Sequence, residues 1–397
     1  MGRPAPRVVI LVENLPVPLD RRVWLEATTL RDAGWQVVVI GPRGGRGMRR
    51  LREVIDGIEI LRYPQRPAAG LMGYLVEYPP SMLFSLAWFV WARLSGRIDV
   101  IHGCNPPDVF FLLGWVGRAW GAHYVFDQHD PNPELSLSKF GGRGLKARLL
   151  YRLTLVLEAA SYRSADLVLT VNETCREIAV KRGRLPAERV VVLRNAPNVA
   201  QLRRFATGIQ PDPKRVGYVG VMGSQDGVDV LLEAWSIVKA ESDMDDAMLE
   251  LIGDGPARVE LERHLTDPRL ASSVTFHGFQ PPARYVPILA RCAIGVSPDP
   301  PTPFNHLSSM VKIMDYLAIG RGCVAFDLNE SRRLGGGAMR IASSPDANGL
   351  AEAILQLLRD PAEANRLQKL ARERMDEMDL DWGSSGQALA DSYASLA

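Results

Sequence analysis

One pattern constrains this chain more than any other. Short runs of β-branched and other apolar residues alternate with longer stretches of helical spacing. Runs that are apolar throughout are typical of strands buried on both faces of a parallel sheet. Strands that alternate with helices are joined by right-handed crossovers and build doubly wound α/β domains. The pattern starts afresh near the middle of the chain, so the sequence predicts two Rossmann-like domains.

Two series of predicted strands define the domain boundaries. The first series comprises residues 8–12, 37–40, 58–61, 100–102, 124–126, 167–171 and 190–193. The second begins at Arg215 and continues through residues 248–252, 274–277, 293–297, 323–326 and 339–342. Residues 195–214 lack periodicity and indicate a linker. We therefore predict an N-terminal domain over 1–196, a C-terminal domain over 197–378, and a final helix within 379–397 that packs back on the first domain.

Length and composition exclude several classes of protein. A chain of 397 residues exceeds what one hydrophobic core usually supports, which agrees with two domains. Lys plus Arg number 47 and Asp plus Glu 45, so the net charge of +2 offers no overall field for nucleic acid. Four scattered cysteines match no metal or disulfide spacing and favour a reducing, cytoplasmic compartment. The N-terminus lacks signal-peptide organisation, which argues against a periplasmic binding protein.

Functional residues are expected just after the strands, because ligands of open α/β sheets bind at the carboxyl ends of the strands. The segment DQHDPNPELS places His129, Asp130 and Glu134 on one loop after residue 126. An imidazole beside carboxylates can steer a hydroxyl or a proton. An Asx-type turn that caps the next helix explains the same residues. Asn105 and Asp108 follow the preceding strand and are expected at the same rim, where a tight turn is the alternative explanation.

A glycine-bearing turn follows the first strand of the second predicted domain. Gly220, Gly223 and Gly227 would allow backbone N–H groups to approach a phosphate. The turn lacks the Lys and Ser/Thr of a P-loop and does not match GxGxxG. These differences argue against an ATPase and against simple dinucleotide binding.

A third motif, NHLSSMVKIMDYLAIGRG, predicts a helix with Ser308 or Ser309 as N-cap and Lys312 in its first turn. A cation near a helix N-terminus opposes the macrodipole, so Lys312 is better explained if it faces an anion such as a diphosphate. Asp315 lies three residues later on the same face and can accept hydrogen bonds from a ribose diol. A solvated Lys and Asp pair is the alternative.

These segments together resemble the retaining GT-B glycosyltransferases of family 4, over nearly the whole chain. VENLPVPLDRRVWLEATTLRDAGWQVVVIGP is similar to the family's opening strand, acceptor-side loop and first helix. LELIGDGP and VTFHGFQPP look like its second-domain segments, and KIMDYLAIGRGCVAFDL resembles its donor-binding helix and following strand. CNPPD, FDQHDPNPEL and GVMGSQDGVD look most like a branch that builds bacterial surface polysaccharides, including N-acetylfucosaminyltransferase-like members.

The resemblance implies a GT-B fold, with both domains facing a central crevice, and a reaction that retains anomeric configuration. It implies a nucleotide-sugar donor, with UDP as the expected nucleotide, and a saccharide or polyprenyl-linked acceptor. No metal or other cofactor is expected. The implied site residues are catalytic (His129, Asp130, Glu134), acceptor-side (Arg21, Arg22, Asn105, Asp108) and donor-binding (Gly223, Gln225, Asp226, Gly253, His277, Ser308, Ser309, Lys312, Asp315).

Two positions depart from the family's pattern. The usual donor helix carries two glutamates, whereas here the second position is Asp315 and the first is Leu307. The basic pair after the first strand of the second domain is replaced by Val221 and Asp226. Phosphate binding would then depend on Lys312, the backbone of 308–310 and the Gly223 turn. A nucleotide-sugar epimerase on the same fold and a non-catalytic GT-B partner subunit are the open alternatives.

Two segments bear on where the protein acts. Residues 82–94 are apolar but well short of the roughly 20 residues that span a bilayer, so they predict a buried or interfacial helix. Residues 42–52 contain no acidic residue and five arginines: Arg43, Arg46, Arg49, Arg50 and Arg52. A solvated loop explains them. Combined with Trp88 and Trp91, however, they predict binding to an anionic membrane surface, at the inner face of the plasma membrane.

Overall fold

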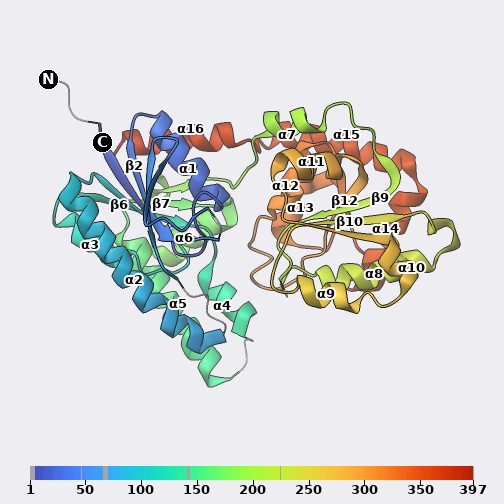
Figure 1. Ribbon diagram of the computed structural model, residues 1–397, viewed down its shortest axis with the longest axis horizontal. Helices are drawn as coiled ribbons and strands as arrows, with labels where there is room; N and C mark the ends of the chain where they lie inside the picture. The colour runs from blue at the N-terminus through green and yellow to red at the C-terminus, as the bar shows by residue number, and fades with distance from the viewer. Residues whose placement is uncertain (1–4, 46, 66–69, 141–143, 224, 397) are drawn as a thin grey trace. The chain divides into compact units, whose positions relative to one another are not determined.

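The computed structural model describes residues 5–45, 47–65, 70–140, 144–223 and 225–396. The chain divides into two compact units (Figure 1). The first contains Met1–Asn195 together with Gly383–Ala397, and the second contains Ala196–Trp382. The first unit is therefore discontinuous in sequence.

The first unit is built on one sheet with the strand order β3-β4-β2-β1-β5-β6-β7-β8 in the described residues. Its strands are β1 (Arg7–Leu11), β2 (Gln36–Pro42), β3 (Arg52–Ile55), β4 (Ile58–Tyr63), β5 (Val100–Cys104), β6 (His123–Gln128), β7 (Leu167–Thr170) and β8 (Val190–Val192). Every pair is parallel except β3 with β4. The central strands β1 and β5 are buried along their whole length, as their apolar sequences predict.

Strand β3 is absent from the sequence-based prediction, which treated its first residue as part of an arginine-rich loop. Its sequence REVI alternates exposed and half-buried residues, and it pairs antiparallel at the edge of the sheet. A short polar edge strand has no continuous apolar run to reveal it. The helices of this unit are α1 (Arg21–Asp32), α2 (Gly70–Ser95), α3 (Phe111–Arg118), α4 (Asn132–Phe140), α5 (Leu145–Ser164), α6 (Glu173–Gly183) and α16 (Trp382–Ala394), with a 3₁₀ turn at Ala187–Arg189.

The second unit has an all-parallel sheet with the order β11-β10-β9-β12-β13-β14 in the described residues. Its strands are β9 (Asp212–Val219), β10 (Met248–Ile252), β11 (Val274–Gly278), β12 (Cys292–Ser297), β13 (Gly322–Ala325) and β14 (Met339–Ile341). Its helices are α7 (Val199–Ala206), α8 (Val228–Ala240), α9 (Arg258–His264), α10 (Pro268–Ser273), α11 (Pro282–Ala290), α12 (Val311–Ala318), α13 (Asn329–Gly335), α14 (Ala347–Arg359) and α15 (Pro361–Glu377), with 3₁₀ turns at Ser242–Met244 and Gly336–Ala338.

The segment expected to be a linker contains helix α7. Asn198 caps this helix by accepting a hydrogen bond from the backbone N–H of Gln201, at 2.9 Å. Val199 and Leu202 are buried in the core of the second unit. The helix has only eight residues, of which three are polar (Gln201, Arg203 and Arg204), so its amphipathic pattern is too short to show as periodicity in the sequence.

The C-terminal segment leaves the second unit after α15 and ends in α16, most of which belongs to the first unit. The turn before α16 is fixed by two hydrogen bonds within the second unit. The N–H of Trp382 donates to the carbonyl of Pro197 at 3.0 Å, and the carboxylate of Asp381 accepts from the N–H of Val199 at 2.8 Å. At the far end of α16, the ring of Tyr393 is fully buried in the first unit.

The apolar segment 82–94 forms the C-terminal half of α2. Phe89 and Ala92 are buried in the core of the first unit, whereas Leu83, Val90 and Leu94 are exposed. No helix in the described part of the chain has the length and apolar content needed to cross a bilayer.

Candidate active site

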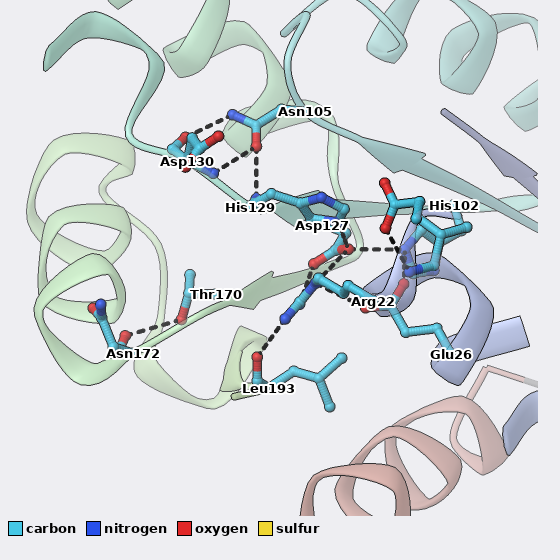
Figure 2. Close-up of polar contacts among 12 residues, drawn as sticks. Arg22, Glu26, His102, Asn105, Asp127, His129, Asp130, Thr170, Asn172 and Leu193 are labelled. Atoms are coloured by element: carbon cyan, nitrogen blue, oxygen red, sulfur yellow. Dashed lines mark hydrogen bonds and ion pairs between the residues drawn. The ribbon is translucent and has the colours of Figure 1, made fainter. Parts of the chain in front are cut away.

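The first polar cluster lies at the carboxyl ends of β5 and β6 and includes residues from α1 (Figure 2). Asp127 is in β6 with its side chain fully buried, and His129 follows the strand by one residue. The guanidinium of Arg22 donates to both carboxylate oxygens of Asp127, from Nη2 at 2.6 Å and from Nε at 3.2 Å. Its Nη1 donates to the carbonyl of Leu193 at 2.7 Å. Arg22 therefore ties α1 to β6 and to the residue that follows the edge strand β8.

Asp127 also contacts two histidines. Its Oδ2 is within hydrogen-bond distance of Nε2 of His129 and lies 3.4 Å from Nε2 of His102. Oε2 of Glu26 lies 3.5 Å from the same His102 nitrogen, and Arg22 bridges to Glu26 Oε1 at 3.0 Å. The cluster thus brings two carboxyl groups, two imidazoles and one guanidinium together in a buried environment.

The surroundings shift the pKa values of the two carboxyl groups, Asp127 and Glu26, in opposite directions. Burial tends to raise the pKa of Asp127, but the charges of Arg22 and His129 and the histidine hydrogen bonds outweigh it and hold that pKa well below its usual range. Burial and the neighbouring Asp127 raise the pKa of Glu26 well above its usual range. Burial lowers the pKa of His102. Asp127 is therefore ionised and His102 neutral at neutral pH, and Glu26 is the carboxyl group of the cluster that is harder to ionise.

Glu26, His102, Cys104 and Asp127 offer ligand atoms within 4.8 Å of one another, which is a possible metal-ligand set. Arg22 argues against this reading because its guanidinium already occupies both oxygens of Asp127. Burial also raises the pKa of the Cys104 thiol well above its usual range, which disfavours the thiolate that a metal needs. The geometry fits an internal ion-pair network better than a metal centre.

Asn105 and Asp108 hold the segment that follows β6. Oδ1 of Asn105 accepts from the backbone N–H groups of His129 and Asp130, at 2.6 and 3.1 Å, and its Nδ2 donates to the carbonyl of Asp130 and to Asp108. Asp108 accepts from Asn132 at 2.5 Å, and burial raises its pKa to about 6. Both side chains are buried, so the structure places them as supports of the His129 segment rather than at an open rim.

Glu134, expected on the same loop as His129, lies instead in the first turn of α4. Its carboxylate pairs with Arg182 of α6 at 2.7 Å, and the same guanidinium contacts Glu158 of α5 at 2.8 Å. Glu134 is nearly buried in this three-helix ion-pair group. This placement separates it from the Asp127 cluster and gives it a structural partner. Arg21, the first residue of α1, is only partly buried, in contrast to Arg22.

The second polar cluster lies at the carboxyl ends of β9 and β12 in the second unit. The ammonium of Lys312, in the first turn of α12, is 2.5 Å from Asp299 Oδ1 and 5.3 Å from the ring centre of Tyr218. A Cβ added to Gly220 would approach Lys312 Cε to 3.1 Å, so Lys312 packs directly against the glycine-bearing turn. Lys312 and Asp299 are both buried. A cation is thus held at the start of a helix beside the glycine-bearing turn.

Asp315 lies one turn further along α12 and accepts from the hydroxyl of Tyr285 at 3.0 Å. The N-cap of α12 is Met310, not Ser308 or Ser309. The hydroxyl of Ser308 donates instead to the carbonyl of Phe304 in the preceding turn, at 3.0 Å. The predicted cap was wrong because α12 begins after Met310, whose side chain makes no capping hydrogen bond.

The turn after β9 is shaped by Asp226 and Gly227. Asp226 accepts from the N–H of Gly223 at 2.9 Å, and burial raises its pKa, opposed by Lys312. Gly227 has φ +68°, and a Cβ there would meet the carbonyl of Pro298. The carbonyl of Gln225 accepts a hydrogen bond of 3.4 Å from Asn305. The turn is therefore held against the loop that carries Asp299.

Gly253 and His277 occupy different surroundings. Gly253 has φ +132° and packs against the backbone of Gly220, so it allows two strand ends to approach closely. Nε2 of His277 contacts Glu250 at 2.7 Å, and Glu250 also pairs with Arg215. The side chain of His277 is thus engaged in an ion-pair group on β9, β10 and β11 instead of the Lys312 cluster.

Several residues of both clusters were missed from the sequence: Glu26, His102, Cys104, Asp127, Tyr218, Tyr285 and Asp299. A usable signal existed for three of them. His102 and Asp127 are polar residues at the ends of apolar runs that the sequence already predicted to be buried strands, and Asp299 follows another such run. Buried polar groups of this kind need internal partners and mark functional or structural clusters.

Comparison with known proteins agrees with this architecture. Residues 19–196 match the family described as Glycosyl transferase 4-like domain, and residues 213–360 match Glycosyl transferases group 1. Glycogen synthase of Mycobacterium tuberculosis is 23% identical over 94% of this chain and 90% of its own. Sucrose-phosphate synthase of Thermosynechococcus elongatus has a TM-score of 0.75 at 17% identity, over 98% and 99% of the two chains. HepE of Anabaena, solved with UDP and glucose, has a TM-score of 0.67 at 15% identity, over 98% and 99%.

Two α/β units with mainly parallel sheets and polar clusters at strand ends, together with these matches, define a GT-B fold whose two units each match a glycosyltransferase domain family. The fold class predicted from the sequence is confirmed. Within that class, the chain combines a first unit of the glycosyl transferase 4-like family with a second unit of the group 1 family.

Proposed function

We propose that the protein transfers a sugar from a nucleoside diphosphate sugar, with UDP as the nucleotide, to a saccharide or lipid-linked acceptor, and that it retains the anomeric configuration. The observation that carries the proposal is Lys312, a buried cation in the first turn of α12 that packs on the Gly220 turn. A helix start and a glycine turn offer N–H groups to a diphosphate, and a nearby ammonium offsets its charge. The UDP and glucose bound by HepE support this donor class.

The two clusters divide the chemistry in this proposal. In the second unit, Lys312 stabilises the charge that develops on the leaving diphosphate, and Asp315 binds the ribose. In the first unit, His129 contacts the transferring sugar or its acceptor. Its imidazole is half-buried and its Nε2 is held by Asp127, so its other nitrogen is the one left to face a ligand. This division needs no metal ion, because leaving-group charge is met by Lys312 and helix-end amides.

A donor screen with product analysis tests the proposal. Among UDP-, GDP-, ADP- and dTDP-sugars, we expect a UDP-sugar to raise the melting temperature most, because ligands of the native state stabilise it by mass action. With acceptor present, NMR of the product should show the anomeric configuration of the donor. Conversion of the donor sugar without acceptor would indicate the epimerase alternative. Donor binding without turnover toward any lipid-linked or saccharide acceptor would indicate a non-catalytic partner subunit.

The first unit also carries the surface expected of a protein that docks on a membrane. Helix α5 exposes Leu145, Leu149, Leu153 and Val156, whose spacing places them on one face. Three exposed cations on the same helix flank that face: Lys146, Arg148 and Arg152. The one acidic residue of α5, Glu158, is buried against Arg182. An apolar stripe bordered by cations and free of exposed acids is the pattern of an interfacial helix.

Neighbouring helices extend this apolar surface. Helix α3 packs on α5 and exposes Leu112, Trp115 and Val116. Trp120, just after α3, stacks on Phe89 of α2. Helix α2 in turn exposes the residues Leu83, Phe84, Leu86, Val90 and Leu94. Figure 1 shows α2, α3 and α5 on the same side of the first unit. We call the exposed apolar and basic residues of these three helices the helical face.

The arginine-rich segment adjoins the helical face but contributes less than the sequence suggested. Leu51 and Arg62 line a groove of about 310 Å³ together with Phe84, Trp88 and Trp91 of α2. Arg52 is in β3, pairs with Glu59 at 2.7 Å and stacks over Trp91 at 4.7 Å, so it is not a free surface cation. Arg43, Arg49 and Arg50 are exposed, and Arg46 lies outside the described residues.

Vesicle flotation tests whether the helical face binds an anionic bilayer. We expect wild-type protein to bind vesicles containing phosphatidylglycerol, more weakly as salt rises. Changing Leu145, Leu149 and Leu153 to Ser should lower binding by at least about a hundredfold, because each buried leucine contributes about 1.5–3 kcal/mol. Changing Lys146, Arg148 and Arg152 to Gln should instead remove the preference for anionic over neutral lipid.

A matched control comes from the second unit, where Val259 of α9 is also exposed. Changing Val259 to Ser should leave flotation unchanged. If the arginine-segment variant with Arg43, Arg49 and Arg50 changed to Ser releases the protein and the α5 variants do not, the arginine segment is the docking element. Wild-type protein that ignores anionic vesicles at low salt would exclude the membrane surface and favour a soluble acceptor.

A further inference from the structure

The C-terminal helix delivers one side chain to the buried cluster at the ends of β5 and β6. Tyr393 of α16 is fully buried, and its hydroxyl lies 2.6 Å from Nδ1 of His102. Its ring packs edge-on against Trp35 at 5.2 Å. The ring also lies near the ring of His102, at 6.2 Å between centroids, but only the hydroxyl forms a hydrogen bond with the polar cluster.

The direction of this hydrogen bond follows from the protonation states. Burial raises the pKa of Tyr393 well above its usual range, so its hydroxyl keeps its proton. Burial lowers the pKa of His102, so the imidazole is neutral and has one N–H. The hydroxyl of Tyr393 then donates to Nδ1, and the imidazole proton is on Nε2. That nitrogen is the one that lies 3.4 Å from Asp127 Oδ2 and 3.5 Å from Glu26 Oε2.

Asp127 links the protonation of His102 to His129, because its carboxylate contacts both imidazoles. The same oxygen, Oδ2, faces Nε2 of both histidines, so the proton on His102 Nε2 helps to fix where that carboxylate points. A hydrogen bond that fixes the tautomer of an imidazole also fixes which ring nitrogen presents a proton to a neighbouring carboxylate. The chain of contacts runs from α16 through β5 and β6 to the segment that carries His129.

We propose that Tyr393 is a positioning residue for His129, acting through His102 and Asp127. The inference rests on the proposed function, in which His129 contacts the transferring sugar or its acceptor. Tyr393 itself touches no substrate in this arrangement. Helix α16 thus helps to set the orientation of an imidazole encoded more than 260 residues earlier.

The groups that face His102 determine how loss of the Tyr393 hydrogen bond would change the titration of its imidazole. Arg22 and Glu26 come from α1, Cys104 from β5, Asp127 from β6, His129 from the segment after β6 and Tyr393 from α16. Asp20 adds a more distant negative charge to the cluster. A hydrogen bond donated to Nδ1 stabilises neutral His102, so its loss raises the His102 pKa. Protonated His102 would then compete with His129 for Asp127 as the pH falls.

The test is Tyr393→Phe, which keeps the ring against Trp35 and removes the hydroxyl. We expect kcat to fall about tenfold with the donor KM nearly unchanged, and the acidic limb of the kcat/KM profile to move to higher pH. Trp35→Phe is the matched control, because it alters the same packing contact without touching the polar chain. A Trp35→Phe effect equal to that of Tyr393→Phe would assign Tyr393 to packing and overturn the inference.

Two further measurements separate the possible failures. If His129→Ala turns over like wild-type protein, the assignment of His129 in the proposed function has failed. If His129→Ala is impaired but Tyr393→Phe keeps the wild-type pH profile and kcat, the positioning role of Tyr393 is wrong. Should Tyr393→Phe fail to fold, ¹⁵N NMR of wild-type His102 still decides, since the inference requires the Nε2-protonated tautomer and the Nδ1-protonated form contradicts it.

Discussion

Replacing Arg22 with Met is expected to lower the free energy of unfolding by about 3–5 kcal/mol, the usual cost of removing one partner from a buried ion pair. The substitution leaves the ionised carboxylate of Asp127 without its two guanidinium hydrogen bonds and the carbonyl of Leu193 without a donor. Methionine keeps much of the volume of the arginine side chain, so cavity formation adds little. Urea denaturation followed by circular dichroism measures the change.

Arg21→Met is the matched control, because Arg21 adjoins Arg22 on α1 but is only partly buried. It should change the unfolding free energy by less than about 1 kcal/mol. The double variant Arg22→Met with Asp127→Asn should recover part of the loss, since the stranded charge is removed with its partner. Equal effects of Arg21→Met and Arg22→Met would show that the ion pair contributes little to stability.

Replacing Lys312 with Ala is expected to lower kcat/KM for the donor by at least about tenfold, or 1.4 kcal/mol of transition-state stabilisation. The ammonium packs on the turn at Gly220, so its loss removes positive charge where the leaving diphosphate is proposed to bind. Asp315→Ala should cause a loss of similar size through the ribose. Steady-state kinetics over a range of donor concentrations measure both effects.

Lys312 also has a structural partner, so its variant needs a control for folding. Asp299, 2.5 Å away and buried, would be left with an unpaired charge. Lys312→Ala combined with Asp299→Asn should recover thermal stability without recovering activity. If the double variant restores both, the activity loss came from unfolding. Wild-type kinetics in Lys312→Ala and Asp315→Ala would exclude both residues from the donor site.

The two sheets were predictable from sequence because their strands are buried on both faces. Strand β10 was predicted with its observed bounds, and β1 and β5 within one or two residues. The misses were elements whose apolar content is low. Strand β3 is polar and lies at an edge, and α7 buries only Val199 and Leu202. Such elements form because a neighbouring strand or core accepts them, which no local pattern encodes.

The site was predictable only where chemistry and local pattern coincide. Lys312 was identified because a cation in a first helical turn conflicts with the macrodipole. Glu134 was misplaced because the sequence does not show that α4 begins at Asn132, which turns its carboxylate toward Arg182. Arg22 and Asp127 are 105 residues apart in the sequence, and His102 and Tyr393 are 291 residues apart. No spacing rule predicts contacts over such separations.

The discontinuity of the first unit has a consequence for how the protein is made. During synthesis, residues 1–195 leave the ribosome long before residues 383–397, which complete the same unit. Domains otherwise tend to fold in the order of their emergence. Until α16 has been synthesised, Nδ1 of His102 lacks the hydroxyl of Tyr393 as its hydrogen-bond partner. A nascent chain therefore presents a first unit that lacks helix α16 until residues 383–397 have been made.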